Sequence, residues 1–232
     1  HRFNENYKAA RQKYEEAINI AIKSKDDYII AMTYWGYGLL LQRIGEYENA
    51  IEPFKKAAPI YKRIGNERLY LQAKNNLASL YHYLGNYDKA IDLTKKTIKI
   101  SKEKNYENEL AYAYLKGAKS KRDKNILDEA ENDLNKSINL LKKLEKEKRV
   151  LGEAYMALGL LQEKKKENDK AIISFNKATE LFKEINQPIY LNSAYGEIIR
   201  FYKDIHKDII SFDKEREGYI DKLVDRKKRI IF

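Results

Sequence analysis

The chain has 232 residues and no cysteine, which excludes disulfide bridges and thiolate metal sites. Its 46 basic and 35 acidic side chains give a formal net charge of +11, and 43% hydrophobic residues are enough to bury a core. No apolar run approaches the roughly 18 residues that cross a bilayer, and no signal-peptide pattern opens the chain, so we expect a soluble, cytoplasmic protein that does not insert into membranes.

The first predicted element is a helix within residues 1–26 that contains Tyr14-Glu15-Glu16-Ala17-Ile18. Two interpretations stay open. The helix runs unbroken from near Phe3 as a cap, or it is half of a hairpin cut from a longer chain, and we favour the second. Asp26-Asp27 precedes the next apolar run, where an aspartate caps a helix by accepting backbone N–H groups.

A motif then repeats about every forty residues. Gly45-Glu46-Tyr47-Glu48-Asn49-Ala50-Ile51 recurs as Gly85-Asn86-Tyr87-Asp88-Lys89-Ala90-Ile91, and its alanine column continues through Ala130, Ala171 and Ser211. Twelve residues before each member lies a second, mostly small column: Gly38, Ala78, Ala118, Gly159 and Ile199. Small residues at a fixed spacing indicate close contacts between helices.

Short breaks divide each repeat into two amphipathic runs of about 17 to 18 residues. A glycine after a run, as at Gly45 and Gly85, closes a helix in the left-handed conformation. No stretch keeps the period-two alternation of a strand. The sequence therefore predicts an all-α fold of antiparallel helical hairpins. Pro53 and Pro59 fall inside one predicted helix, which we expect to kink rather than end.

These columns resemble the tetratricopeptide repeat signature. The residues that carry the resemblance in the first full hairpin are Tyr34, Tyr37, Gly38, Leu41, Gly45, Tyr47, Ala50, Phe54 and Ala57. The resemblance covers about residues 10–212, and its period of forty exceeds the commonest unit of about 34 residues. It implies long helices, a fold shared with peptide-sensing bacterial regulators and with signalling or motor-cargo adaptors, and protein binding without catalysis.

The resemblance also implies an α-solenoid, a right-handed superhelix of antiparallel helical hairpins. We predict an N-terminal half-repeat or cap helix at 1–26, repeats at 27–66, 67–106, 107–146 and 147–187, and a degenerate fifth repeat with a capping helix at 188–232. The repeat at 107–146 is degenerate. The alternative for the last residues, Arg226 to Phe232, is a junction to a further segment.

Catalytic and metal-binding patterns are missing. The three histidines, His1, His82 and His206, are far apart and have no cysteine partner, and no phosphate-binding glycine loop follows a strand. We therefore predict no enzyme activity, no cofactor and no metal. For His82, the favoured interpretation is a polar residue of the groove or a histidine that packs between helices, and a functional role is the alternative.

In a solenoid of this kind the first helices of successive hairpins line a concave groove. The candidate partner-binding residues are Met32, Trp35 and Leu39 from the first hairpin, Gln72, Asn75, Asn76, Ser79 and His82 from the second, and Tyr112, Lys116, Lys119 and Arg122 from the third. The predicted groove thus changes from apolar through amide to basic.

This gradient suits an extended peptide with an acidic group. Amide side chains pair with peptide backbone, and the three cations, three residues apart, form a patch for a carboxylate or phosphate. Trp35 with Met32 and Leu39 anchors an apolar side chain, or equally fills space between helices. Solvation of the lysines is the favoured alternative for the basic patch.

Several partner classes follow. We predict capture of a protein or peptide segment, with a sensory module of a larger signalling protein, such as a peptide-sensing regulator or a histidine-kinase-type receptor, as the alternative. Basic residues mixed with acids disfavour nucleic acid, which is the second alternative. Asn76 and Lys116 match only part of the chaperone-tail carboxylate clamp of these repeats, so chaperone binding is not predicted. Self-association is compatible with the sequence, and the residue usage is typical of an AT-rich bacterial genome.

Overall fold

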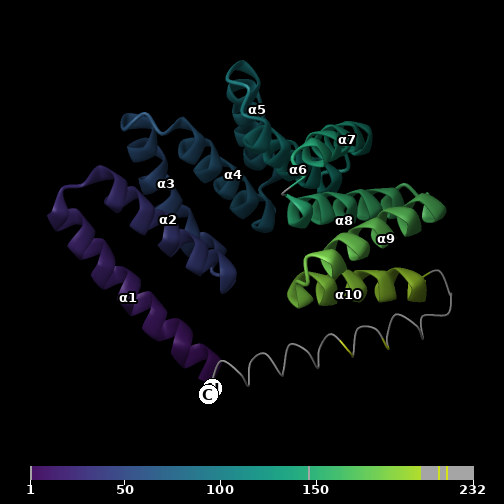
Figure 1. Ribbon diagram of the computed structural model, residues 1–232, viewed down its shortest axis with the longest axis horizontal. Coiled ribbons are helices and arrows are strands. Elements are labelled where there is room, and N and C mark those ends of the chain that lie inside the picture. Colours follow the sequence, from purple (N-terminus) through teal and green to yellow (C-terminus); the bar gives the residue numbers. More distant parts are fainter. Residues whose placement is uncertain (1, 146, 205–213, 215–217, 219–232) are drawn as a thin grey trace. The chain divides into compact units, whose positions relative to one another are not determined.

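The computed structural model describes residues 2–145, 147–204, 214 and 218 (Figure 1). These residues contain ten α-helices and no strand, which confirms the all-α prediction. The helices are α1 (Arg2–Ser24), α2 (Asp27–Arg43), α3 (Tyr47–Arg63), α4 (Glu67–Tyr83), α5 (Tyr87–Glu103), α6 (Glu107–Asp123), α7 (Leu127–Lys143), α8 (Lys148–Lys164), α9 (Asn168–Glu184) and α10 (Pro188–Asp204). Ser211, His206 and nearly all of the predicted C-terminal capping helix lie outside the described residues.

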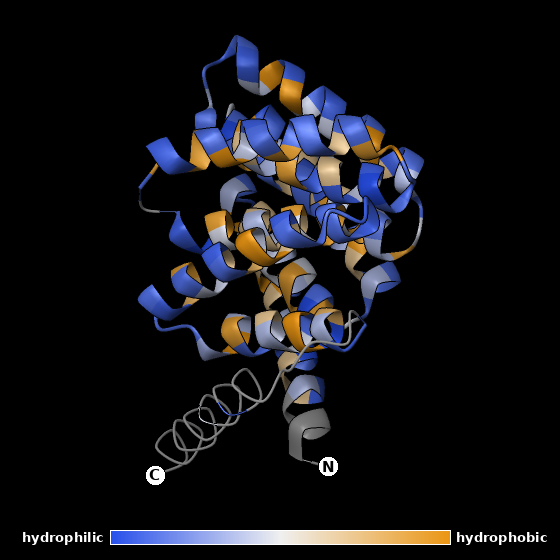
Figure 2. Ribbon diagram, turned by 90° about the vertical axis from the view of Figure 1, so that its right-hand side faces the viewer, coloured by the Kyte–Doolittle hydropathy of each residue, from blue (hydrophilic) through white to orange (hydrophobic). Residues whose placement is uncertain are grey.

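The helices follow one another with a regular rhythm. Each helix from α2 to α10 has 17 residues, as the sequence predicts, and α2 to α7 begin twenty residues apart. Two consecutive helices therefore span the forty-residue period. Hydrophobic residues alternate with hydrophilic ones along the helices, as the amphipathic pattern requires (Figure 2). None of the described helices combines the length and the apolar character needed to cross a membrane.

The chain divides into two compact units, residues 1–126 and residues 127–232. In the first unit, each helix from α1 to α5 packs on the helix that follows it, and α4 also contacts α6. In the second unit, α7 packs on α8, α8 on α9 and α9 on α10. Packing between neighbours in sequence is the α-solenoid arrangement. The proposed repeat at 107–146 spans both units and stays a prediction.

The small columns lie where helices touch. Ala50, Ala90, Ala130 and Ala171 are fully buried. A methyl group on Gly38 would lie 2.8 Å from the Phe54 ring, so glycine lets α2 and α3 approach closely. Phe54 belongs to a cluster with Leu41, Ala50, Leu77 and Leu80, which joins α2, α3 and α4. The spacing of small residues thus predicts the contacts correctly.

The turns between helices use the left-handed backbone region. Gly45, Gly65 and Gly85 have φ angles of +84°, +74° and +72°, which confirms the expected glycine closure. Later turns place other residues in the same region, with Asn105 at +54° and Lys166 at +62°. Asparagine tolerates this conformation better than most side chains, which explains its recurrence at these turns.

Two helices concern segments on which the sequence analysis made specific predictions. Helix α3 continues through Pro53 and Pro59, so the expectation that it does not end there is confirmed, and a kink stays a prediction. Helix α1 runs unbroken over 23 residues, which is compatible with both interpretations of the N-terminal segment, so each stays a prediction.

Asp26 caps α2 as predicted. Its Oδ1 atom accepts hydrogen bonds from the backbone N–H groups of Tyr28 at 2.8 Å and Ile29 at 3.1 Å. We expect Asp26→Ala to lower the free energy of unfolding by about 1 kcal/mol in urea titrations, because both donors lose their acceptor. Asp26→Asn keeps an acceptor oxygen and serves as the control. Equal losses in the two variants would show that the cap contributes nothing.

Candidate functional site

All twelve residues predicted to bind a partner lie on α2, α4 and α6 of the first unit. On α2, Met32 and Leu39 expose 49% and 45% of their surface, and they share a face because they are seven residues apart. Trp35 is partly buried and packs edge-on against Tyr61, with ring centroids 5.8 Å apart. The contacts of Trp35 therefore agree with the interpretation that it fills space between helices. The other two apolar candidates, Met32 and Leu39, are exposed.

Several of the predicted binding residues on α4 instead form contacts within the protein, between α4 and α6. Gln72 Nε2 donates to Glu109 Oε1 at 3.0 Å, and Asn75 Nδ2 donates to the Glu109 carbonyl oxygen at 3.3 Å. Ser79 Oγ donates to the carbonyl oxygen of Asn75 at 3.1 Å. Asn75 and Ser79 are buried, which corrects the expectation that they face a partner. Asn76 is half-buried beside these residues.

We call the contact that Gln72, Asn75 and Glu109 form between α4 and α6 the α4–α6 seam. Sequence reasoning did not predict Glu109 as one of its residues. Glu109 is 2% exposed, and its Oε2 atom has no hydrogen-bond partner among the described residues, with Arg68 Nη1 3.9 Å away. In the neighbouring repeats the equivalent positions hold Leu69 and Val150, so a carboxylate in an apolar column was the available signal. A buried acceptor without a hydrogen-bond donor is costly, so the nearby Arg68 guanidinium is the group that offsets the charge of this carboxylate.

His82 packs at the end of the same seam. Its Nδ1 atom lies 3.3 Å from Ser120 Oγ and its Nε2 atom 3.5 Å from Asp123 Oδ2, and its ring contacts the Tyr83 and Tyr87 rings. Burial lowers the pKa of His82 to about 4, and the Asp123 carboxylate opposes this shift only in part. The imidazole is therefore neutral at pH 7, as the packing interpretation requires.

The basic residues of α6 gather around this histidine. Lys119, Arg122 and Lys116 each lower the pKa of His82, so their positive fields overlap at one place. All three are half-buried, and the Arg122 guanidinium pairs with Asp123 at 2.7 Å. Tyr112 is half-buried one turn before Lys116 on α6. We call Asn76, Tyr112, Lys116, Lys119 and Arg122 the basic face.

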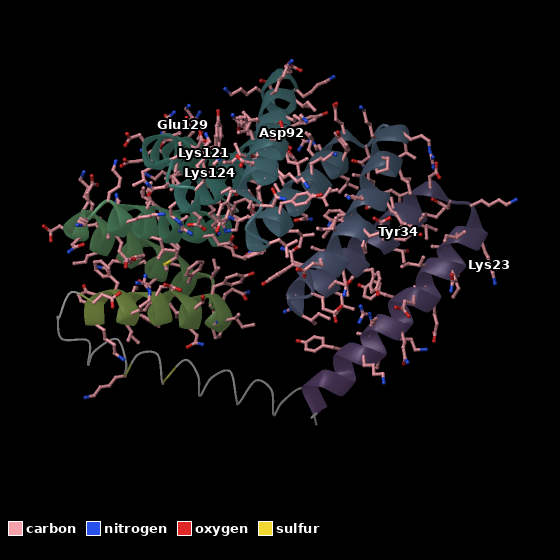
Figure 3. All side chains as sticks on the ribbon, turned by 180° about the vertical axis from the view of Figure 1, so that it is seen from behind. Lys23, Tyr34, Asp92, Lys121, Lys124 and Glu129 are labelled. Carbon is pink, nitrogen blue, oxygen red and sulfur yellow. The ribbon has the colours of Figure 1, made fainter. Side chains whose placement is uncertain are left out.

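A buried cation on α6 was not predicted as part of any site. Lys121 is 8% exposed, and Figure 3 labels it on the ribbon. Its equivalents in the neighbouring repeats are Tyr81 and Gln162. Within the described ranges, no three histidine or acidic side chains come together in a way that could hold a metal ion.

Comparison with solved structures shows where this fold occurs. BtubC (BKLC) from P. vanneervenii matches with a TM-score of 0.69 and 17% identity over 97% of this chain and 92% of that chain. The Rap conjugation gene regulator of the plasmid pLS20, solved with the Phr* peptide, matches with 0.75 and 16% over 95% of this chain and 60% of that chain.

A third similar structure is PlcR of Bacillus thuringiensis in complex with the peptide PapR7 and DNA. Its TM-score is 0.64 and its identity 18%, over 83% of this chain and 72% of that chain. At these identities the likeness shows the fold alone. The chain spans about 60% of the length of the pLS20 regulator.

The sequence was also compared with curated proteins and with models of protein families. Among curated proteins none matches this chain. One model of the tetratricopeptide repeat matches residues 1–63 and 29–103, and a second model of the same repeat matches residues 152–184. Together with the forty-residue helix pairs and the all-α fold, these matches show that the chain belongs to the tetratricopeptide repeat family.

Proposed function

We propose that the first unit captures an extended segment of a peptide or protein without catalysis. The observation that carries this proposal is the basic face, where three cations act together at one end of the α4–α6 seam. An acidic side chain or terminal carboxylate of the partner pairs with Lys116 and Lys119, and Asn76 pairs with its backbone. The exposed Met32 and Leu39 on α2 offer apolar contacts. The cytoplasmic location stays a prediction.

Similar structures support this proposal. The pLS20 regulator was solved with the Phr* peptide, and PlcR with PapR7. Both contain chain beyond the part that this protein matches, which favours a sensory module of a regulator as the second candidate. In that case the partner is a short signalling peptide or an output domain. Both candidates are tested in the same way, by comparing the partner binding of wild type with that of a variant in which the charge of the basic face is reversed.

Reversing the charge of the basic face should weaken binding of acidic peptides. We expect Lys116→Glu with Lys119→Glu to raise the Kd at least about tenfold for those peptides of an acidic array that bind wild type, measured by fluorescence anisotropy at physiological salt. The matched control is Lys95→Glu with Lys99→Glu, which makes the same change in net charge on exposed residues of α5.

Three outcomes contradict the proposal. If both double variants weaken peptide binding equally, the acidic peptides are attracted only by the net charge of the protein. An array from which wild type binds no peptide removes the basic face as a peptide site. If Asn76→Ala and the variant Lys116→Glu with Lys119→Glu both bind peptide as tightly as wild type, the peptide binds elsewhere on the unit.

A further inference from the structure

A pocket of about 390 Å³ lies between α1, α2 and α3, away from the basic face. Ile18, Leu41 and Pro53 give it apolar lining, and Tyr34 and Tyr37 add two aromatic rings. Tyr34, Tyr37 and Leu41 share one side of α2 through their helical spacing, which is opposite to Met32 and Leu39. Figure 3 shows Tyr34 near the α1 ribbon. The volume falls in the range of small-ligand sites.

The arginine of this pocket is already neutralised. Arg11 Nη2 donates to Glu46 Oε2 at 2.7 Å and Nη1 donates to Oε1 at 3.2 Å. Its Nε atom donates to the Tyr37 hydroxyl at 3.2 Å, and that hydroxyl donates to Glu15 Oε1 at 3.1 Å. A bidentate pair of this kind fixes the guanidinium, so Arg11 positions Tyr37 and Glu15 and leaves no net charge for an anion.

Part of the remaining polar lining offers acceptors. Glu52 lines the pocket, is exposed, and forms no hydrogen bond or ion pair within the described part of the chain. Pro53 has no N–H group, so the backbone carbonyl of Asn49 lacks the donor that a helix normally supplies four residues later. The Asn49 side chain donates its Nδ2 to Glu46 at 2.8 Å, which commits its donor group elsewhere. Glu52 and the Asn49 carbonyl therefore suit a ligand that brings donors.

The protein itself places a cation at this site. The Lys56 ammonium lies 5.3 Å from the centre of the Tyr34 ring, within the range of a cation–π contact. Lys56 is exposed, so its long side chain can move away. The contact shows that the Tyr34 ring accepts an alkylammonium group.

We propose that this pocket binds an alkylammonium group, in a ligand as small as a diamine or at the end of a lysine side chain of a partner. The ammonium displaces Lys56 from the Tyr34 ring, and its N–H groups are accepted by Glu52, Glu15 and the Asn49 carbonyl. Arg11 pairs with both Glu46 and, at 3.8 Å, Glu15, and the three carboxylates of Glu15, Glu46 and Glu52 exceed the cations of Arg11 and Lys56 by one negative charge. A chain with a net charge of +11 thereby has a local site that attracts cations.

The test uses pentylammonium as the probe, with pentanoate and 1-pentanol as the anionic and uncharged ligands of equal length. We expect only pentylammonium to shift the side-chain amide NMR signals of Asn19 and Asn49 in a saturable way. Glu52→Gln should weaken its binding about fivefold, and Lys56→Met should tighten it by a similar factor because the tethered competitor is removed. Glu48→Gln and Lys55→Met, at exposed positions of α3 outside the pocket, should change nothing.

Equal shifts by pentanoate, or full affinity in Glu52→Gln, would overturn the proposal. Weaker binding in Lys56→Met would also overturn it, since it would make Lys56 part of the site rather than its competitor. Comparison of 1,5-diaminopentane with Nα-acetyl-lysine amide then assigns the source, because tighter binding of the diamine indicates a free amine and tighter binding of the amide indicates a partner's lysine. None of these measurements depends on peptide binding at the basic face.

Discussion

Gly159→Ala should lower the free energy of unfolding by about 2 kcal/mol. A methyl group at this position of α8 would lie 2.4 Å from Cε1 and 2.5 Å from Cδ1 of Phe175, far inside van der Waals contact. Phe175 is 1% exposed and packs edge-on against Phe201, so its ring cannot move aside cheaply. Overpacking of this severity costs about 3 kcal/mol, and the better helix propensity of alanine returns about 1 kcal/mol.

Gly196→Ala is the matched control, because Gly196 also lies inside a helix, α10, of the second unit. A methyl group there meets nothing within 4 Å. Only the propensity gain remains, so this variant should be more stable than wild type by up to about 1 kcal/mol. Urea unfolding followed by far-ultraviolet circular dichroism measures both changes. If the two variants shift in the same direction, the close approach of α8 to Phe175 is not the cause.

Acidification should destabilise the protein through His82. The pKa of this side chain is about 4 in the folded protein and about 6.5 when it is unfolded, so the unfolded chain binds the proton more tightly. The stability contributed by the neutral imidazole is complete above pH 6.5 and is lost as the pH falls from 6.5 to 4. A shift of this size corresponds to about 3 kcal/mol.

His82→Gln isolates this contribution, because glutamine keeps a polar side chain and does not titrate. Between pH 7 and pH 4, wild type should lose about 3 kcal/mol more than the variant, which retains the titration of every carboxylate and of the other histidines. Urea midpoints measured at several pH values give the difference. Parallel pH curves for the two proteins would contradict a buried, neutral His82.

The sequence predicts the helices well because their determinants are local. Gly45 and Gly85 end helices through backbone conformation, Asp26 begins one through its side chain, and Ala50 and Gly38 mark contacts through size alone. Each of these effects acts within one turn or one hairpin, so residue type and spacing are sufficient. Even Pro53, which is buried, leaves α3 intact, since its missing donor affects one carbonyl.

The candidate site is less predictable, because neighbouring stripes on one helix look alike in the sequence. Gln72, Asn75, Ser79 and His82 follow one stripe of α4, and three of them form contacts with α6. Asn76, one residue from Asn75, lies outside the buried seam. The stripe that meets the next helix depends on the crossing angle between helices, which residue spacing does not specify. Glu109 and the pocket around Tyr34 depend on the same three-dimensional placement.

The position of Trp35 gives the molecule an intrinsic optical reporter. It is the only tryptophan, and its indole lies against Tyr61 between α2 and α3. Its emission therefore senses the solvent around this one hairpin, whereas the nineteen tyrosines are spread along the chain. A ligand at Met32 on one side of α2, or at Tyr34 on the other, can be followed through this emission without any attached dye.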